Sequence, residues 1–537
     1  MTVTFAVVPE SALSYAFYAV PFLLLYLSLN YFYNSLHVFP GPFWAHLTDL
    51  WRYLDVKGRR PERTHIELHR QYGDIVRLGP RTLSFADPQA IKVIYGLNKG
   101  FTKVCPSHKF NIRIASNNGQ SEFYPVQMTV SKGEPLPSLF STLDESFHAN
   151  LRRSVNHAFS MSSLVQYEPL VDETTEIFLD QTSRVFANGT TVCDFARWLQ
   201  FFAFDVIGSI TYSKRHGFVE NNHDVDGIVQ SLARIFDYSA PVGQMPWLDK
   251  LFWKNPIFDL LQKLNLADNS HPVAIFAKQR MQERLAAKSS SSSTTPSAPT
   301  ASAPKDDLLT MFLKAGEARP DFMTNKRILT MAVSMAFAGS ETTAISIAAV
   351  FYYLLKAPPC MARLRQELDD AVSSGAIANR PTGLVSWSES RKLPYLDACI
   401  KEAFRLHPAA GLPLERVVPA AGVEISGRFI PGGTIVGCSP WVIHRREDIF
   451  GPETDRFIPE RWLDAQPERV KAMEGRMLQF GAGSRTCIGK NISLMEIYKI
   501  VPSFLRRFDV CPLPRIFLLP LSFPLFPSCS LFLSSEV

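Results

Sequence analysis

The 537-residue sequence lacks the cysteine patterns that mark metal centres and disulfide-rich scaffolds. Its eight cysteines are widely spaced and none forms a C-x-x-C pair, which excludes the spacings typical of zinc sites, iron–sulfur sites and c-type haem attachment. A disulfide scaffold is not expected in a chain of this length. We therefore predict isolated thiols in a reducing compartment, most of them buried as small apolar side chains.

Clustered basic charge is also absent. The formal net charge is +6, but lysine and arginine are scattered along the chain and do not form a basic run interleaved with aromatic residues. This distribution excludes the usual footprint of a nucleic-acid-binding protein. A mildly basic surface remains suited to an acidic protein partner.

Charged residues are missing altogether from residues 11–35, which are rich in Leu, Phe and Tyr. A helix of this length can cross the ~30 Å hydrocarbon core of a bilayer. A cleaved signal peptide is the alternative, but a basic n-region and an A-x-A site are absent. Glu10 precedes the segment and four basic residues follow it by position 60, so the positive-inside rule places the bulk of the chain in the cytosol. We predict a membrane anchor over 1–36 and a proline-containing hinge over 37–60.

Helical periodicity dominates the chain as far as residue 510. Apolar residues recur at three- and four-residue steps over five segments: 146–159, 171–186, 273–288, 326–356 and 395–406. β-like runs at 74–85 and 422–436 predict one small sheet. Residues 288–305 consist almost entirely of Ser, Thr, Pro and Ala and are expected to form a disordered linker between two helices. We therefore predict one mainly α domain with a small β part over 61–510.

A glycine-rich turn surrounds one cysteine at residues 480–489, FGAGSRTCIG. Gly481 and Gly483 permit a tight turn. Backbone N–H groups at the start of the following helix can stabilise the thiolate of Cys487 without a metal cage. Arg485 is suited to pairing with a neighbouring carboxylate. The alternative for an arbitrary G-x-G-x-R-x-C sequence is a structural loop with a buried thiol.

The whole decapeptide resembles the F-x-x-G-x-R-x-C-x-G haem-ligand loop of the cytochrome P450 family. The resemblance implies that Cys487 is the axial ligand of a haem b iron and that Phe480 packs beside the thiolate. It also implies that Arg485 meets a haem propionate and that Gly489 lets the following helix approach the flat cofactor. A thiolate ligand favours cleavage of the O–O bond, so such a site activates dioxygen.

Two further family elements concern charged residues. Glu402 and Arg405 form an E-x-x-R pair at i,i+3 in YLDACIKEAFRLHP. By itself the pair is equally typical of a solvated helix surface. The sequence FIPERW at 457–462 matches the family's P-E-R element, and the resemblance implies that Arg461 joins Glu402 and Arg405 in a buried triad behind the haem. Because buried charges need complete pairing, we predict that Glu402→Ala abolishes haem incorporation.

The apolar segment MAVSMAFAGSETTAISI carries polar residues in its middle. A core helix with back-bonded threonines is one explanation. Residues 338–343 also fit the family's A-G-x-[DE]-T-T element. The resemblance implies that Thr342 hydrogen-bonds dioxygen, that Glu341 belongs to a proton relay, and that Gly339 opens the helix for the oxygen molecule.

Further haem-contacting residues follow from the resemblance alone. His148 and Arg152 stand at i,i+4, where many P450s have W-x-x-x-R with both side chains reaching a propionate. Histidine replaces tryptophan here, which weakens the assignment of His148. Arg416 and His444 are additional candidates.

The resemblance covers residues 38–510, and several runs look like the fungal microsomal enzymes related to pisatin demethylase, a group active in secondary metabolism. It implies the P450 fold and insertion of one oxygen atom into a lipophilic molecule. The partners implied are dioxygen, NADPH-cytochrome P450 reductase and cytochrome b5, at the endoplasmic reticulum membrane. The alternatives are a reductase-independent isomerase or dehydratase and a catalytically disabled haem protein.

Two segments do not fit the family pattern. Residues 104–120 interrupt a family-like stretch, and the residues at their ends can be encoded by fungal splice-donor and splice-acceptor sequences. We predict a retained in-frame intron, with a genuine surface loop as the alternative. The tail, 511–537, opens in the same way, and its prolines argue against a second membrane helix. We predict intron read-through, which would leave the chain without the family's C-terminal hairpin.

Overall fold

The computed structural model describes residues 35–97, 99–103, 123–131, 134–187, 191–264, 266, 271–291, 307–512 and 530–535, together with residues 21, 25, 28 and 31. Almost all of the predicted anchor, the 104–120 segment and most of the 288–305 linker lie outside these residues.

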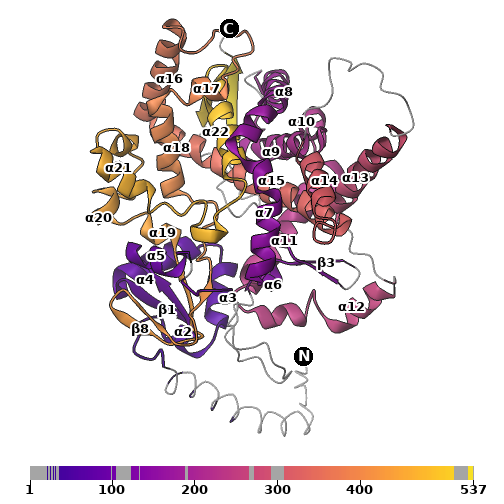
Figure 1. The fold of residues 1–537 in the computed structure, drawn as a ribbon. Coiled ribbons are helices and arrows are strands. Elements are labelled where there is room, and N and C mark those ends of the chain that lie inside the picture. The colour runs from indigo at the N-terminus through magenta and orange to yellow at the C-terminus, as the bar shows by residue number, and fades with distance from the viewer. Residues whose placement is uncertain are drawn as a thin grey trace, which may run out of the picture.

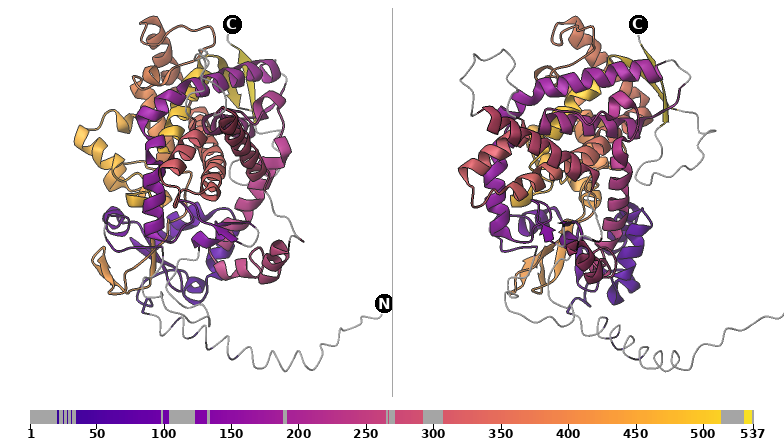
Figure 2. Two further views of the ribbon diagram at one scale, coloured as in Figure 1. Left: turned by 45° about the vertical axis from the view of Figure 1, so that its right-hand side comes forward. Right: turned by 90° about the vertical axis from the view of Figure 1, so that its right-hand side faces the viewer.

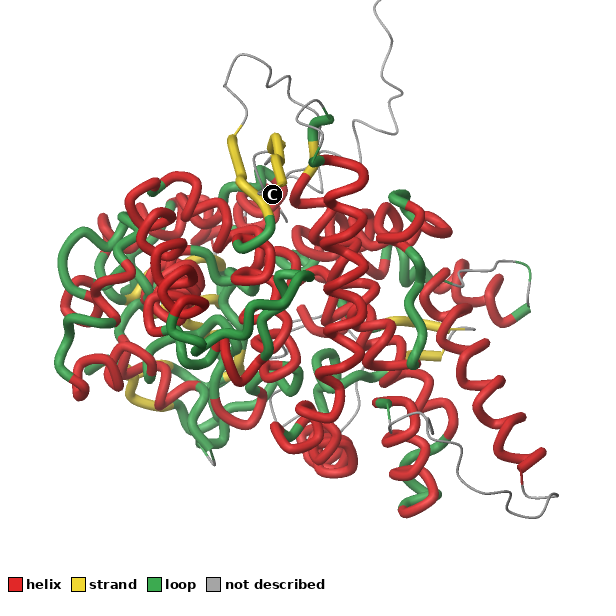
Figure 3. The backbone as a smooth tube through the Cα atoms, turned by 90° about the horizontal axis from the view of Figure 1, so that it is seen from above, coloured by secondary structure: helices red, strands yellow, loops and turns green. Residues whose placement is uncertain are grey.

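The described chain is mostly helical (Figure 3). The helices of the first half are α2 (Phe43–Leu47), α3 (Leu50–Lys57), α4 (Pro61–Tyr72), α5 (Pro88–Ile94), α6 (Phe123–Val126), α7 (Glu145–Val155), α8 (Met161–Phe186), α9 (Phe195–Tyr212), α10 (Phe218–Asn221), α11 (Ile228–Val242) and α12 (Pro256–Lys263). Those of the second half are α13 (Pro272–Ser291), α14 (Leu308–Ala318), α15 (Asn325–Lys356), α16 (Pro358–Ser373), α17 (Trp387–Ser390), α18 (Pro394–Leu406), α19 (Pro440–Ile443), α20 (Glu447–Phe450), α21 (Pro467–Glu474) and α22 (Lys490–Leu505).

The strands of the described residues form four small sheets. Their bounds are β1 (Ile75–Gly79), β2 (Thr82–Phe85), β3 (Thr129–Ser131), β4 (Glu134–Leu136), β5 (Cys193–Asp194), β6 (Arg416–Val417), β7 (Val423–Ile425), β8 (Arg428–Ile430), β9 (Ile435–Cys438), β10 (Phe508–Pro512) and β11 (Ser530–Ser535). The largest sheet has the order β1-β2-β9-β6, with β2 parallel to β9 and the other pairs antiparallel. The remaining strands pair as β7-β8, β3-β4 and β10-β11-β5.

The helical core is built around α15, which packs against α9, α13, α14, α18 and α22. Every residue of α9 except Ala196 and Arg197 is buried, because other helices surround it. A cluster of aromatic side chains joins α8, α9, α15 and α22, including Phe178, Phe351 and Phe504. Asp144, Ser160 and Thr324 cap α7, α8 and α15 by accepting hydrogen bonds from backbone N–H groups.

The four-stranded sheet lies at the lower end of the molecule in Figure 1, with α6 and α12 at the same level and most of the other helices above it. In the turned views of Figure 2, the purple α8 crosses the helical part at the end away from that sheet. Helices α2 to α5 accompany the sheet, and its own small core contains residues of β2, α5 and β9. This arrangement matches the predicted mainly α fold with a small β part.

The five predicted segments all lie in helices, and the predicted bounds differ most from the observed ones at α7 and α8. α8 begins ten residues before the predicted segment at Val171, and residues 156–159 form a 3₁₀ turn after α7. The prediction of one sheet from 74–85 and 422–436 was right in part: β9, which begins at Ile435, joins β1 and β2 in the four-stranded sheet by pairing with β2, whereas β7 and β8 pair with each other in a sheet of their own. At the end of the chain, β11 pairs with β10 and with β5. The antiparallel pair of β10 and β11 includes tail residues for which we expected no C-terminal hairpin. Intron read-through as the origin of the tail stays a prediction.

Candidate functional site

The Cys487 loop is a tight turn that connects a short 3₁₀ segment, Gly483–Arg485, to the start of α22. The Cys487 backbone N–H donates to the Phe480 carbonyl at 2.8 Å. Gly481 and Gly483 both have φ of +68°, a region that disfavours residues with a Cβ. A Cβ on Gly483 would lie 1.7 Å from the carbonyl oxygen of Tyr95. The turn predicted from the sequence is therefore confirmed, and it requires glycine at position 483.

The Cys487 side chain is exposed, whereas Cys193, Cys399 and Cys438 are buried. Desolvation by the surrounding loop raises the pKa of the Cys487 thiol, while the Gly489 and Lys490 backbone N–H groups and the charge of Arg152 act to lower it. A metal cation at the sulfur would favour the thiolate strongly. A Cβ added to Gly489 would have no neighbouring atom within 4 Å, so the space beside this glycine is empty of protein atoms.

Cationic side chains from three parts of the chain gather beside this loop. Arg152 donates to the Thr486 carbonyl at 2.7 Å, and Arg485 pairs with Glu145 at 2.7 Å. Arg416 donates to the Tyr124 hydroxyl at 2.9 Å. His148 is buried, and desolvation together with the charges of Arg485, Arg152, Lys103 and Arg416 lowers its pKa to about 3. The structure thus brings together four residues selected from the sequence: His148, Arg152, Arg416 and Arg485.

A buried lysine that sequence analysis missed belongs to the same group. The Lys103 side chain is 2% exposed and its ammonium nitrogen lies 3.6 Å from the centre of the Tyr124 ring. Its pKa is lowered to about 5 by desolvation and by Arg485 and Arg416. No motif surrounds Lys103 in the sequence, so only the tertiary structure identifies it.

The polar residues of α15 face different surroundings. Thr342 is exposed, and its hydroxyl donates to the Ala338 carbonyl at 2.7 Å. The Glu341 carboxyl instead accepts a hydrogen bond from the side-chain amide of Gln200 on α9. Desolvation by burial raises the pKa of Glu341 to about 7, and the Gln200 hydrogen bond acts against this shift. Gln200 was not identified from the sequence, because α9 has no motif.

Gly339 allows α15 and α9 to approach closely. A Cβ at this position would lie 2.9 Å from Cγ1 of Ile207. In the structure, Gly339 therefore serves the packing of α15 against α9. A role in admitting oxygen stays a prediction.

Glu402, Arg405 and Arg461 form the triad predicted from the sequence. The Glu402 carboxylate accepts from Nε and Nη2 of Arg405, both at 2.8 Å, and from Nε of Arg461 at 2.9 Å. Trp462 and the backbone N–H of Ile458 complete its partners at 2.9 and 3.0 Å. Burial opposes ionisation, but the two arginines outweigh it and hold the pKa of Glu402 below its usual value.

His444 connects the triad to the segment that precedes the Cys487 loop. Its Nε2 accepts from the Leu478 backbone N–H at 2.8 Å, and its Nδ1 lies 3.1 Å from the Arg405 carbonyl. Both ring nitrogens are therefore engaged by the backbone. This places His444 in the scaffold and not beside the thiol.

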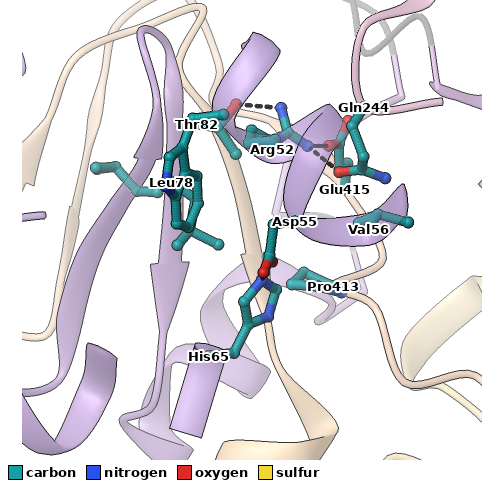
Figure 4. Close-up of a pocket in the computed structure, with 12 residues that line it drawn as sticks. Arg52, Asp55, Val56, His65, Leu78, Thr82, Gln244, Pro413 and Glu415 are labelled. Atoms are coloured by element: carbon teal, nitrogen blue, oxygen red, sulfur yellow. Dashed lines mark hydrogen bonds and ion pairs between the residues drawn. The ribbon is translucent and has the colours of Figure 1, made fainter. Parts of the chain in front are cut away.

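Arg416 is positioned by a second buried network, shown in Figure 4. Arg52 on α3 binds the Glu415 carboxylate and donates to Gln244 at 2.8 Å and Thr82 at 2.9 Å. A cavity of about 20 Å³, room for roughly one water, lies beside these groups. The Glu415 carbonyl also accepts from Arg416 at 2.8 Å. The network therefore holds Glu415 in place, and the Glu415 carbonyl in turn positions Arg416 in the cationic group.

Comparison with known proteins identifies the family. The model for the cytochrome P450 family matches residues 116–516. This chain belongs to the cytochrome P450 family. A cytochrome P450 monooxygenase from Aspergillus terreus is 39% identical over 492 residues, covering 92% of this chain and 94% of the relative.

Other fungal relatives agree. Cytochrome P450 monooxygenase cicH from Emericella nidulans is 40% identical over 491 residues and covers 91% of each chain. Cytochrome P450 monooxygenase asR2 from Sarocladium schorii is 37% identical and covers 89% of this chain and 88% of its own. This P450 is accordingly a fungal-type monooxygenase with a haem cofactor. The closer resemblance to pisatin demethylase stays a prediction.

The site fits that cofactor. Haem carries two carboxylates, and in the described part of the chain the group formed by Lys103, Arg152, Arg416 and Arg485 has a single carboxylate partner, Glu145 on Arg485. The exposed thiol of Cys487 supplies the one ligand that a thiolate-bound haem needs from the protein.

Proposed function

We propose that this P450 inserts one atom of dioxygen into a lipophilic small molecule, a fungal secondary metabolite or a xenobiotic. Electrons would come from NADPH through cytochrome P450 reductase, with cytochrome b5 as an additional donor. The observation that supports the proposal best is the exposed Cys487 thiol in a glycine-dependent turn beside an excess of cations. A thiolate-bound haem supplies the chemistry that cleaves the O–O bond.

The chain's own residues divide the remaining tasks. Cys487 would hold the iron, and Arg152, Arg485, Arg416 and His148 would face the propionates. Phe480 would stay beside the sulfur, because its carbonyl already accepts from the Cys487 N–H at 2.8 Å. The Glu402 triad lies in the scaffold and would keep the loop in place through His444.

Glu341 and Thr342 would handle protons on the other side of the site. A carboxyl with a pKa near the working pH can both accept and return a proton. The Thr342 hydroxyl donates to a carbonyl of its own helix, so it can turn toward another acceptor without breaking a tertiary contact. The presence of both residues favours an oxygenase over a reductase-independent isomerase or dehydratase.

Membrane attachment is part of the same proposal. Within the described residues, α15 is the one helix long and apolar enough to span a membrane, and 56% of the relevant window is buried in the fold. It is therefore the central core helix. We propose instead that residues 1–36 form a single-pass anchor in the endoplasmic reticulum membrane, with the catalytic domain in the cytosol.

Exposed apolar residues support this placement. They include Phe43, Trp44, Leu50 and Leu54 on α2 and α3, and Trp247, Leu251, Phe252, Trp253, Ile257 and Leu260 around α12. α3 packs against α11, and Tyr53 and Trp253 line one hollow, so the two groups are neighbours. Removal of residues 1–36 should abolish flotation of the whole chain with phospholipid vesicles or weaken it strongly. Undiminished flotation would show that the anchor is not needed.

Four basic residues, Arg153, Lys490, Arg506 and Arg507, are the candidates for docking an acidic reductase. Arg153 and Lys490 are exposed, as an electrostatic contact requires. Arg507 instead pairs with Asp180 at 2.7 Å, and Arg506 donates to the Gly383 carbonyl at 3.2 Å. We therefore propose Arg153 and Lys490 as the residues that contact the reductase.

The first test is the reduced, carbon monoxide-bound difference spectrum of the whole chain and of Cys487→Ser. A red-shifted thiolate band is expected for the wild type and not for the variant. Cys360→Ala should leave the band unchanged. NADPH consumption coupled to an oxygenated product then separates a monooxygenase from an isomerase and from a disabled haem protein. A wild-type chain that binds haem without a thiolate band would refute the assignment of Cys487.

A further inference from the structure

A hollow in the surface lies between α3, α11 and the segment that precedes α12. Its volume of about 520 Å³ is within the ~300–1,000 Å³ range of small-molecule sites. Besides two apolar residues of α11, it is lined by four aromatic and two charged side chains: Tyr53, Tyr238, Phe252, Trp253, Lys57 and Asp237. We call it the aromatic hollow. No residue of the Cys487 loop or of α15 lines it, so it is a place apart from the haem site.

Two of the four rings are held in place by the fold. Tyr238 and Trp253 stack with their ring centres 4.2 Å apart and an interplanar angle of 10°. The Tyr238 hydroxyl donates to the Asp249 carboxylate at 2.8 Å, and Lys254 binds the same carboxylate at 2.7 Å. Lys254 also donates to the Pro125 carbonyl at 2.7 Å, which ties this segment to α6. The two rings therefore form a rigid wall that a ligand meets without reorganisation.

Charges of both signs stand beside this wall. Lys57 is exposed, and its Nζ lies 5.6 Å from the centre of the Tyr53 ring. Asp237 pairs with Arg59 at 3.1 Å, but the two side chains are 52% and 42% exposed. Such an exposed pair is weak, so Asp237 can attract a second cation. A ligand that matches the aromatic hollow therefore carries one cation and one anion.

A trimethylammonium group suits the cationic part of this description. It has no N–H to donate, and proteins bind it on the faces of aromatic rings. A phosphate suits Lys57, whereas Asp237 repels a headgroup whose net charge is negative. Leu54 on α3 and Phe252 are each 56% exposed next to Tyr53 and Trp253 in the chain. Aromatic residues with exposed apolar neighbours are typical of the boundary between a bilayer and water.

We propose that the aromatic hollow binds the phosphocholine headgroup of a membrane lipid, phosphatidylcholine. The trimethylammonium group would lie against the ring of Trp253 with Asp237 nearby, and the phosphate would face Lys57. The inference rests on the membrane attachment in the proposed function and adds a lipid-specific contact to it. Such a contact orients the catalytic domain on the bilayer and takes no part in the oxygenation.

Binding of short-chain lipids to the full chain tests this site. The protein is kept in dodecyl maltoside and titrated by isothermal calorimetry with monomeric dihexanoyl lipids that differ only in the headgroup. The wild type should bind the phosphatidylcholine about threefold more tightly than the phosphatidylethanolamine, whose ammonium is smaller and more strongly hydrated. Trp253→Leu should lose this preference. Lys57→Met should weaken both lipids by about two- to fivefold, because both carry the phosphate.

A matched pair of aspartates separates the site from a general effect of charge. Asp237→Asn should weaken phosphatidylcholine binding by about two- to fivefold. Asp74→Asn is the control, because Asp74 also pairs with an arginine, Arg446, and is 51% exposed. It should leave the affinity unchanged. Equal affinity of the wild type for the two lipids overturns the inference, and so does an Asp237→Asn protein that binds phosphatidylcholine as the wild type does.

Glycerophosphocholine distinguishes a membrane lipid from the free headgroup. It should bind roughly tenfold more weakly than dihexanoylphosphatidylcholine, because it has no acyl chains to cover Leu54 and Phe252. Equal affinity would overturn the assignment to a lipid. The titration needs neither haem nor insertion of residues 1–36 into a bilayer. A negative result therefore leaves the proposed function standing, which the carbon monoxide difference spectrum and the flotation experiment test separately.

Discussion

Replacing Glu402 tests the triad that sequence and structure share. The carboxylate is fully buried and accepts five hydrogen bonds, from Arg405, Arg461, Trp462 and the Ile458 backbone. Removing one member of a buried ion pair costs about 3–5 kcal/mol, because the remaining charge stays buried without its partner. Here two arginines lose their anion. We therefore expect Glu402→Ala to reach at least the upper part of that range.

The expected loss is large compared with the total stability of a protein. A native state is stable by about 5–15 kcal/mol, so ~5 kcal/mol changes the folded-to-unfolded ratio by several thousandfold. Urea unfolding followed by tryptophan fluorescence at about pH 7, where Glu402 is ionised in both states, measures this loss. The carbon monoxide difference spectrum measures haem incorporation in the same samples. Glu402→Gln keeps the volume of the side chain and should also lose most of the band, because the charge is missing.

The control replaces a glutamate that also pairs with an arginine but is exposed to solvent. Glu173 on α8 pairs with Arg215 at 2.7 Å, and its side chain is 59% exposed. Glu173→Ala should cost about 0–1 kcal/mol and leave the spectrum unchanged. If Glu402→Ala also costs less than about 1 kcal/mol and keeps a full band, the triad does not stabilise the site and the argument from buried charge is wrong.

Three further expectations follow from the structure. Burial raises the pKa of Glu341 from 4.5 to about 7, so the native state binds a proton more tightly than the unfolded state and wild-type stability falls as the pH rises through that window. Urea unfolding at several pH values should show a flatter profile for Glu341→Gln, and an identical slope would contradict the shift. Gly339→Ala should cost roughly 1–3 kcal/mol through its contact with Ile207, and clearly less in an Ile207→Ala background. Sequencing of the transcript should yield a main product without 104–120 and 511–537, whereas uninterrupted reads through both would refute the intron hypothesis.

Helices with one apolar face were predictable from the sequence. The five periodic segments correspond to helices or parts of helices, and the residues 395–406 match α18 within one residue at its start. α9 was not predicted, because a helix buried on nearly all sides has no alternation of apolar and polar faces. The sequence placed the two β-like runs in one sheet, but it did not indicate that β2 and β9 pair in parallel, since a parallel contact between distant segments leaves no local turn signal.

Site residues were predictable where a motif constrains spacing along the chain. Cys487, Arg485, Glu402 and Arg405 belong to such motifs. Lys103 and Gln200 do not, and each acquires its place only by packing against residues far away in the sequence. Gly339 belongs to a motif, yet its observed contact with Ile207 depends on how closely α9 and α15 approach.

The sequence by itself determined which chemistry this P450 carries. Three local features carry it: a lone cysteine in a glycine-rich turn, an E-x-x-R pair and an acid–threonine pair. The backbone conformation that each needs is set by residues next to it in the sequence. The tertiary structure decided which charges meet. Arg152, Arg416, Arg485 and Lys103 come from four separate segments, and electrostatic interaction depends on distance in space and on burial. The excess of positive charge that suits a dicarboxylate cofactor therefore appears only when the chain is folded.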